Sequence, residues 1–208
     1  MRIDPETVLW STPERERAGR PLLVLLHGYG SHEGDLFGLS PRLPLGPVIA
    51  SLRAPLPENG GNAWFTLMDS ERGNPPAENV DAAATAVLDW LDTQEYTSVG
   101  LLGFSQGAAV SLQMLRHAPS RFAATVALSG FLAGGGHPGD AELAALRPPV
   151  FVGRGTADTI ITEAAVVRTE EWLPTHTDST YRIYEDLAHS ISAEELTEVS
   201  AFLATHLK

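Results

Sequence analysis

The sequence predicts an α/β fold in which helices cover both faces of a mostly parallel central sheet. Short runs rich in Val, Ile and Leu alternate with longer segments of helical periodicity, which is typical of βαβ units. Most of these runs are continuously apolar rather than alternating, as expected for strands that are buried on both faces. The predicted strands are residues 22–26, 48–52, 98–103, 124–128, 150–153 and 180–184.

Helical periodicity predicts three further elements. Apolar residues recur on one stripe over residues 80–91, behind a predicted N-cap at Asn79. Residues 162–173 form a second predicted helix, which we expect Pro174 to end. A capping box of Ser192 and Glu195 predicts the start of a C-terminal helix.

Length and composition indicate a single globular domain over residues 1–208. The chain has 208 residues, of which 43% are hydrophobic and 19% charged, which excludes both a disordered chain and a membrane-spanning protein. Acidic residues and a proline occupy the first positions (Asp4, Pro5, Glu6), where a secretory signal would be apolar. We therefore expect a cytoplasmic protein.

Charge and cysteine content narrow the partners and the chemistry. With 14 Lys and Arg against 26 Asp and Glu, the net charge of −12 repels phosphate backbones and anionic bilayers. We expect no nucleic-acid partner and no stable membrane association, and the sequence leaves a homodimer open. The chain has no cysteine, which excludes disulfides, thiolate metal sites and a cysteine nucleophile.

The strongest chemical signal is the sequence Gly-Phe-Ser-Gln-Gly at residues 103–107. This G-x-S-x-G pattern follows a predicted strand and precedes a helical segment, which is the setting of the nucleophile elbow of α/β-hydrolases. Two glycines let the chain make a sharp turn that exposes the serine hydroxyl. We therefore predict Ser105 as a nucleophile, and a plain helix N-cap is the alternative interpretation.

A serine nucleophile needs a base, and α/β-hydrolases place it downstream of the serine. The histidines in that part of the chain are His117, His137, His176, His189 and His206. Three of them lie in or just beyond helix ends, where a cation favours the helix dipole. His137 lies in a glycine-rich loop with no strand to orient it. His189 follows the last predicted strand, at the sheet edge where ligands bind, and is the predicted base.

The acid that orients the histidine is predicted to be Asp158. It follows the predicted strand 150–153 directly and lies between the serine and the histidine in the chain. The alternative role for Asp158 is to cap the next helix, but Thr162 is better placed for that. Asp186 is the second candidate for the acid.

The oxyanion of an acyl-transfer reaction needs two preset backbone donors. One is the amide of the residue after the serine, Gln106, and the other comes from the loop after an early strand. In that loop, residues 27–30 read His-Gly-Tyr-Gly, and the Tyr29 amide is the predicted donor. We interpret His27 as a packed structural residue.

Together these motifs are similar to the phospholipase/carboxylesterase family of small α/β-hydrolases, which includes acyl-protein thioesterases. The resemblance covers about residues 21 to 207 and rests on residues 27–30, 63–65, 103–108, 127–130, 155–158 and 189–192. It implies a triad of Ser105, Asp158 and His189, and an oxyanion hole made by Tyr29 and Gln106. It also implies hydrolysis of carboxylic esters or thioesters without a metal or other cofactor.

We expect a serine carboxylesterase that acts on small-molecule esters of short to medium acids. The alternatives are an acyl thioesterase or lysophospholipase with the same triad, and a non-catalytic binding module of the same fold. Residues 56–79, rich in Gly and Pro, predict a long loop beside the site, and its Trp64, Phe65 and Leu67 predict the wall of the acyl pocket. Trp64 has an alternative role in a small core that fixes the loop. No insertion between the strands is long enough for a large lid domain.

Overall fold

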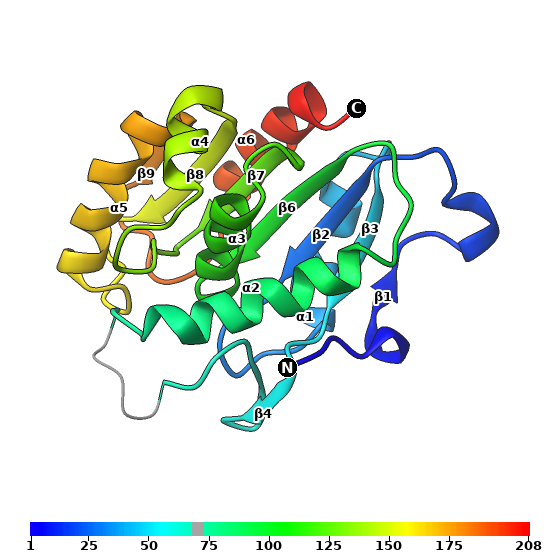
Figure 1. Cartoon of the computed structure of the whole chain (residues 1–208), viewed down its shortest axis with the longest axis horizontal. Coiled ribbons are helices and arrows are strands. Elements are labelled where there is room, and N and C mark those ends of the chain that lie inside the picture. Colours follow the sequence, from blue (N-terminus) through cyan, green and yellow to red (C-terminus); the bar gives the residue numbers. More distant parts are fainter. Residues whose placement is uncertain (68–72) are drawn as a thin grey trace.

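The computed structural model describes residues 1–67 and 73–208 and is built on a seven-stranded sheet (Figure 1). All neighbouring strands are parallel except the first pair, which is antiparallel. In spatial order the strands are β1 (Leu9–Trp10), β3 (Val48–Leu52), β2 (Leu22–Leu26), β6 (Val99–Phe104), β7 (Phe122–Leu128), β8 (Pro149–Gly155) and β9 (Asp178–Tyr184).

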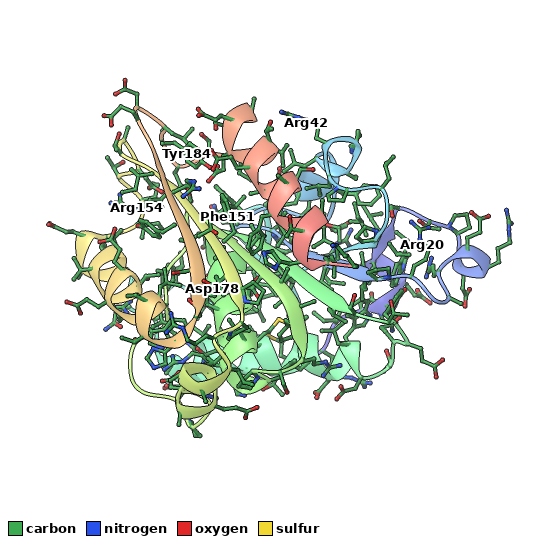
Figure 2. All side chains as sticks on the ribbon, turned by 90° about the horizontal axis from the view of Figure 1, so that it is seen from above. Arg20, Arg42, Phe151, Arg154, Asp178 and Tyr184 are labelled. Atoms are coloured by element: carbon green, nitrogen blue, oxygen red, sulfur yellow. The ribbon has the colours of Figure 1, made fainter. Side chains whose placement is uncertain are left out.

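Helices cover both faces of this sheet, as predicted. On one face, α2 (Ala77–Leu91), α3 (Gln106–His117) and α5 (Glu163–His176) share a core, and α4 (Asp140–Leu146) packs beside α5. The other face carries α1 (Gly34–Phe37) and α6 (Ala193–His206). Figure 2 shows α6 on the side of the sheet opposite α5, with Phe151 of β8 between them. Single 3-10 turns lie at Pro5–Thr7, Glu14–Glu16 and Ser40–Arg42.

The six predicted strands are all present, because continuous apolar runs are what a doubly covered sheet requires. Every residue of β2 and β3 is buried. The edge strand β9 departs from this pattern, since most of its residues are exposed or half-buried. Among the described residues, no helix combines the length and the apolar character needed to cross a membrane.

Two predicted helix boundaries are wrong. Helix α2 begins at Ala77 and its N-cap is Pro76, not Asn79, because Pro76 is extended with ψ 130° and its carbonyl already accepts the Asn79 amide at 3.0 Å. Helix α5 continues through Pro174 to His176. A proline in the last turn removes only one backbone donor, and the Thr175 hydroxyl caps the carbonyl of Trp172 at 2.8 Å.

Residues 56–79 are not one continuous loop. They contain a hairpin of β4 (Leu56–Glu58) and β5 (Gly61–Ala63) and the start of α2, while residues 68–72 lie outside the described residues. The turn is Asn59-Gly60, with positive φ of 56° and 76° at the two residues. Asn-Gly is a strong signal for such a two-residue turn, so the sequence could have predicted this hairpin.

Candidate active site

Ser105 occupies a strained turn between β6 and α3. Its φ of 54° and ψ of −114° lie in a region that residues other than glycine rarely adopt. The flanking glycines make this turn possible, because a Cβ on Gly107 would lie 2.0 Å from the Leu26 carbonyl oxygen and one on Gly103 would lie 2.3 Å from the Gly107 oxygen. The sequence prediction of a sharp elbow at this serine therefore agrees with the backbone.

The side chains of Ser105, His189 and Asp158 form one chain of hydrogen bonds. His189 Nε2 lies 2.9 Å from Ser105 Oγ, and His189 Nδ1 lies 2.8 Å from Asp158 Oδ2. This geometry suits a neutral imidazole that donates from Nδ1 to the carboxylate and accepts at Nε2 from the serine hydroxyl. The structure thus brings together the three side chains that the sequence predicted as a triad.

Loops after two neighbouring strands hold the histidine and the carboxylate. Asp158 follows β8 and His189 follows β9, so both reach the same edge of the sheet as Ser105. The Asp158 side chain is only 5% exposed, and its Oδ1 accepts the amides of Ile160 at 2.8 Å and Ile161 at 3.2 Å. With both carboxylate oxygens occupied, the side chain is fixed in the orientation that meets His189.

The alternative acid and the alternative role of Asp158 fit the structure less well. Asp186 is exposed, and its amide donates to Thr156 Oγ1 at 2.9 Å. Thr162 caps α5, where its hydroxyl accepts the Ala165 amide at 3.4 Å. Asp158 is therefore available for His189.

The loop after β2 lies against the serine. Tyr29 and Gln106, whose amides are the predicted oxyanion donors, both line the cavity at Ser105. Within residues 1–67 and 73–208, neither amide is used in a backbone hydrogen bond. His27 has the structural role that the sequence indicated. It is fully buried, donates from Nδ1 to the Gly28 carbonyl at 2.7 Å and accepts the Ala54 amide at Nε2, and burial lowers its pKa.

The side chain of Gln106 has a second role that sequence reasoning missed. Its Oε1 accepts the Trp64 amide at 2.8 Å, and its Nε2 donates to the Phe65 carbonyl at 2.6 Å. The Trp64 indole in turn donates to the His27 carbonyl at 2.8 Å. These bonds tie the segment after the β4–β5 hairpin to the nucleophile elbow. A glutamine inside the elbow motif was the available signal, because a buried amide requires partners.

An apolar cavity of about 470 Å³ opens beside Ser105. Phe65 and Leu67 line it, as predicted, but Trp64 does not: it is fully buried behind the wall, so its prediction as a pocket residue is wrong. The indole N–H explains the difference, because it needs the His27 carbonyl as a partner. The other large apolar lining residues were not predicted from the sequence; they are Pro75, Phe104, Phe131, Ile160 and Ile161.

A smaller cavity of about 280 Å³ also borders His189. Phe104, His189 and Asp35 line both cavities, so the two cavities adjoin at the edge of the sheet that carries Ser105. Asp35 is exposed, and its Oδ2 accepts the Ser31 hydroxyl at 2.6 Å. It places a carboxylate at the rim, and no Lys or Arg lines either cavity within the described part of the chain.

Residues 11–207 match the family model described as phospholipase/carboxylesterase. The chain belongs to the phospholipase/carboxylesterase family. Among curated relatives of this family member, acyl-protein thioesterase 1 of Debaryomyces hansenii is 30% identical over 184 residues, covering 81% of this chain and 75% of the relative. Esterase YpfH of Escherichia coli is 27% identical, covering 93% of this chain and 84% of the esterase.

Solved structures share the architecture of this phospholipase/carboxylesterase family member. The Bacillus cereus carboxylesterase superposes with a TM-score of 0.81 at 19% identity, covering 96% of this chain and 94% of that one. Esterase PE8 superposes with a TM-score of 0.78 at 24% identity over all of both chains. The chain is therefore a serine hydrolase with the α/β-hydrolase fold, and no large additional domain interrupts the sheet in its described residues.

Proposed function

We propose that the protein is a carboxylesterase that hydrolyses neutral esters of short to medium acids through an acyl-enzyme intermediate. The observation that carries this proposal is the hydrogen-bonded chain from Ser105 through His189 to Asp158 at the mouth of an apolar cavity. A nucleophile, a base and a carboxylate in this geometry are what acyl transfer requires. The apolar cavity is suited to the acyl group.

In the first half of the reaction, Ser105 Oγ attacks the ester carbonyl while His189 Nε2 takes the hydroxyl proton. Asp158 stabilises the imidazolium that forms, and the amides of Tyr29 and Gln106 donate to the oxyanion. His189 then gives its proton to the departing alcohol. In the second half, His189 takes a proton from water, the hydroxide attacks the acyl-serine, and the acid leaves as Ser105 recovers its proton.

The charge at the site supports a neutral leaving group. Asp35 lies where the two cavities meet, and the chain as a whole carries a net charge of −12. A leaving group with phosphates, such as coenzyme A, would approach against this field. Of the two cavities, we assign the larger one to the acyl group and the smaller one to the alcohol.

An acyl thioesterase is the second candidate, because the relative that is 30% identical is named acyl-protein thioesterase 1. The same triad would act on either ester. Oxygen and thiol esters that carry the same acyl group separate the two functions. The type of ester that is hydrolysed with the higher kcat/KM indicates the better assignment. A lysophospholipase activity would show as turnover of single-chain phospholipids in the same assay.

A fluorophosphonate probe tests the proposed nucleophile directly. We expect covalent labelling of the native protein, no labelling of Ser105→Ala, and full labelling of the matched control Ser190→Ala, whose exposed serine lies beside His189. Labelling that persists in Ser105→Ala would contradict the assignment.

The cytoplasmic location and the homodimer stay predictions. We also propose that residues 1–208 act as one domain, since strands from Leu9 to Tyr184 share one sheet.

A further inference from the structure

Three potential metal ligands gather at the end of α3 that is remote from Ser105. They are Asp81 on α2, His117 in the last turn of α3 and His137 in the loop before α4. One ligand atom from each lies within 4.8 Å of the others. Ser105 directly precedes α3, whose 12 residues span about 18 Å, so the cluster is separate from the proposed active site.

We propose that Asp81, His117 and His137 form a binding site for Zn²⁺ or a similar divalent transition-metal ion. Two imidazole nitrogens and one carboxylate oxygen are a common protein ligand set for zinc, with water in the fourth position. Oxygen-rich sites suit Mg²⁺ and Ca²⁺, so this cluster selects against them. The family resemblance implied no metal for the reaction, and these three ligands were not found from the sequence because they are far apart in the chain.

Two of the ligands are already held in contact. Asp81 Oδ1 lies 2.8 Å from His117 Nε2, so a proton on the imidazole joins them. Gln113 donates from Nε2 to the same carboxylate oxygen and fixes its direction from the next turn of α3. A zinc ion bound at Nε2 would take the place of the shared proton, and the neutral imidazole would then carry its proton on Nδ1. Since α2 and α3 pack along each other, this pair needs little rearrangement.

The third ligand needs a small local adjustment. The His137 ring lies 4.5 Å from the His117 ring, centroid to centroid, at 64°. Its Nδ1 accepts the Gly139 amide at 3.1 Å. Ligation through either ring nitrogen gives up that hydrogen bond, because Nδ1 must then hold either the ion or the proton. We therefore expect micromolar rather than nanomolar affinity.

The nearest positive charge on α3 is paired with a carboxylate and so opposes a bound cation less. Arg116 is the nearest cationic side chain on α3, and its guanidinium is paired with Asp140 at 2.7 Å. The His137 amide donates to the same Asp140 carboxylate at 2.8 Å, which anchors the loop that carries the third ligand. The ion would thus join α2, α3 and this loop, which are distant in sequence. It would act on stability and leave catalysis unchanged.

Calorimetric titration of the metal-stripped protein with ZnCl₂ tests this site. His189 and Asp158 could also bind zinc, so the titrations use a His189→Ala background. We expect one saturable ion per chain, with affinity lowered about 10-fold or more by Asp81→Asn or His137→Ala. His206→Ala is the matched control, because it removes a histidine from a helix end outside the cluster. Mg²⁺ should not compete.

Two further measurements keep the outcome clear. Co²⁺ in place of Zn²⁺ should give visible absorption bands that His137→Ala abolishes. In the native background, zinc at a hundredfold excess over its Kd should raise Tm by about 5 °C, and His137→Ala should lose this rise while it keeps serine labelling. Binding that survives both cluster variants, or no saturable binding at all, would overturn the proposal.

Discussion

At the scale of single residues, the proposed triad makes the most direct prediction. Ser105→Ala or His189→Ala should lower kcat by about 10⁶-fold, and Asp158→Asn by about 10⁴-fold, because the amide no longer favours the productive imidazole tautomer. Asp186→Asn is the matched control and should retain activity. Steady-state kinetics on a small neutral ester measures all four. Loss of activity in Asp186→Asn with retention in Asp158→Asn would reverse the choice of acid.

Asp35 should control which leaving groups the enzyme accepts. Replacing it by Asn removes the carboxylate that both cavities share, and we expect kcat/KM for an acyl-coenzyme A thioester to rise about fivefold at low salt. The value for a neutral ester should change little, and the difference should shrink in high salt because exposed charges are screened. An equal effect on both substrates would mean that Asp35 acts through structure and not through charge.

Glu195 should make the protein less stable as the pH rises. Its side chain is fully buried, and this burial raises its pKa to about 7, although the Ser192 backbone amide acts in the opposite direction. The unfolded chain releases this proton near pH 4.5, its ordinary value, whereas the folded protein holds it to about pH 7. The stabilising contribution is therefore complete below pH 4.5 and is lost as the pH rises to about 7.

The variant Glu195→Gln keeps the shape of the side chain and removes the titration. We expect it to raise the free energy of unfolding at pH 8 by about 2 kcal/mol relative to the native protein, with little difference at pH 4.5. Urea unfolding at several pH values measures this. Glu194→Gln, at the exposed neighbouring position, should leave the pH dependence unchanged. Parallel curves for the native protein and Glu195→Gln would show that Glu195 does not titrate in this range.

At the scale of elements, the segment after the β4–β5 hairpin should set acyl-chain preference. Phe65→Ala enlarges the cavity and Leu67→Trp shortens it, so their preferred acyl lengths should shift in opposite directions. Kinetics across an ester series of increasing acyl length measures the shift, with Leu45→Ala, at an exposed position outside the cavity, as the control. An unchanged preference in both variants would mean that this segment is not the pocket wall.

The sequence predicted elements well where burial on both sides decides them. The strands 22–26 and 48–52 have the predicted bounds, because a fully buried strand leaves a continuous apolar run. The two-residue strand β1 and the short hairpin strands leave no such run. The extent of α5 depended on tertiary packing, since Trp172 and Leu173 are buried just before Pro174 and hold the last turn in place.

At the scale of the whole molecule, the proposed site was predictable where topology alone places a residue. Ser105, Asp158 and His189 each follow a parallel strand, and the ends of parallel strands meet at one edge. The pocket lining was harder to predict, because nothing in the sequence shows that an apolar loop residue such as Ile160 lines a cavity. The proposed metal site could not be predicted from the sequence, since neither spacing nor periodicity relates Asp81 to His137.

Ser105 and His189 lie far apart in the sequence, and this has a consequence during protein synthesis. His189 bonds to a serine that lies 84 residues earlier, and it follows the last strand of the sheet. A nascent or prematurely terminated polypeptide that ends before β9 therefore exposes the elbow without its base. We expect ribosome-released fragments 1–177 to resist fluorophosphonate, whereas the full chain reacts. Reactivity of the serine would then serve as a sensor of completed translation and folding, and could be followed in a cell-free lysate over time.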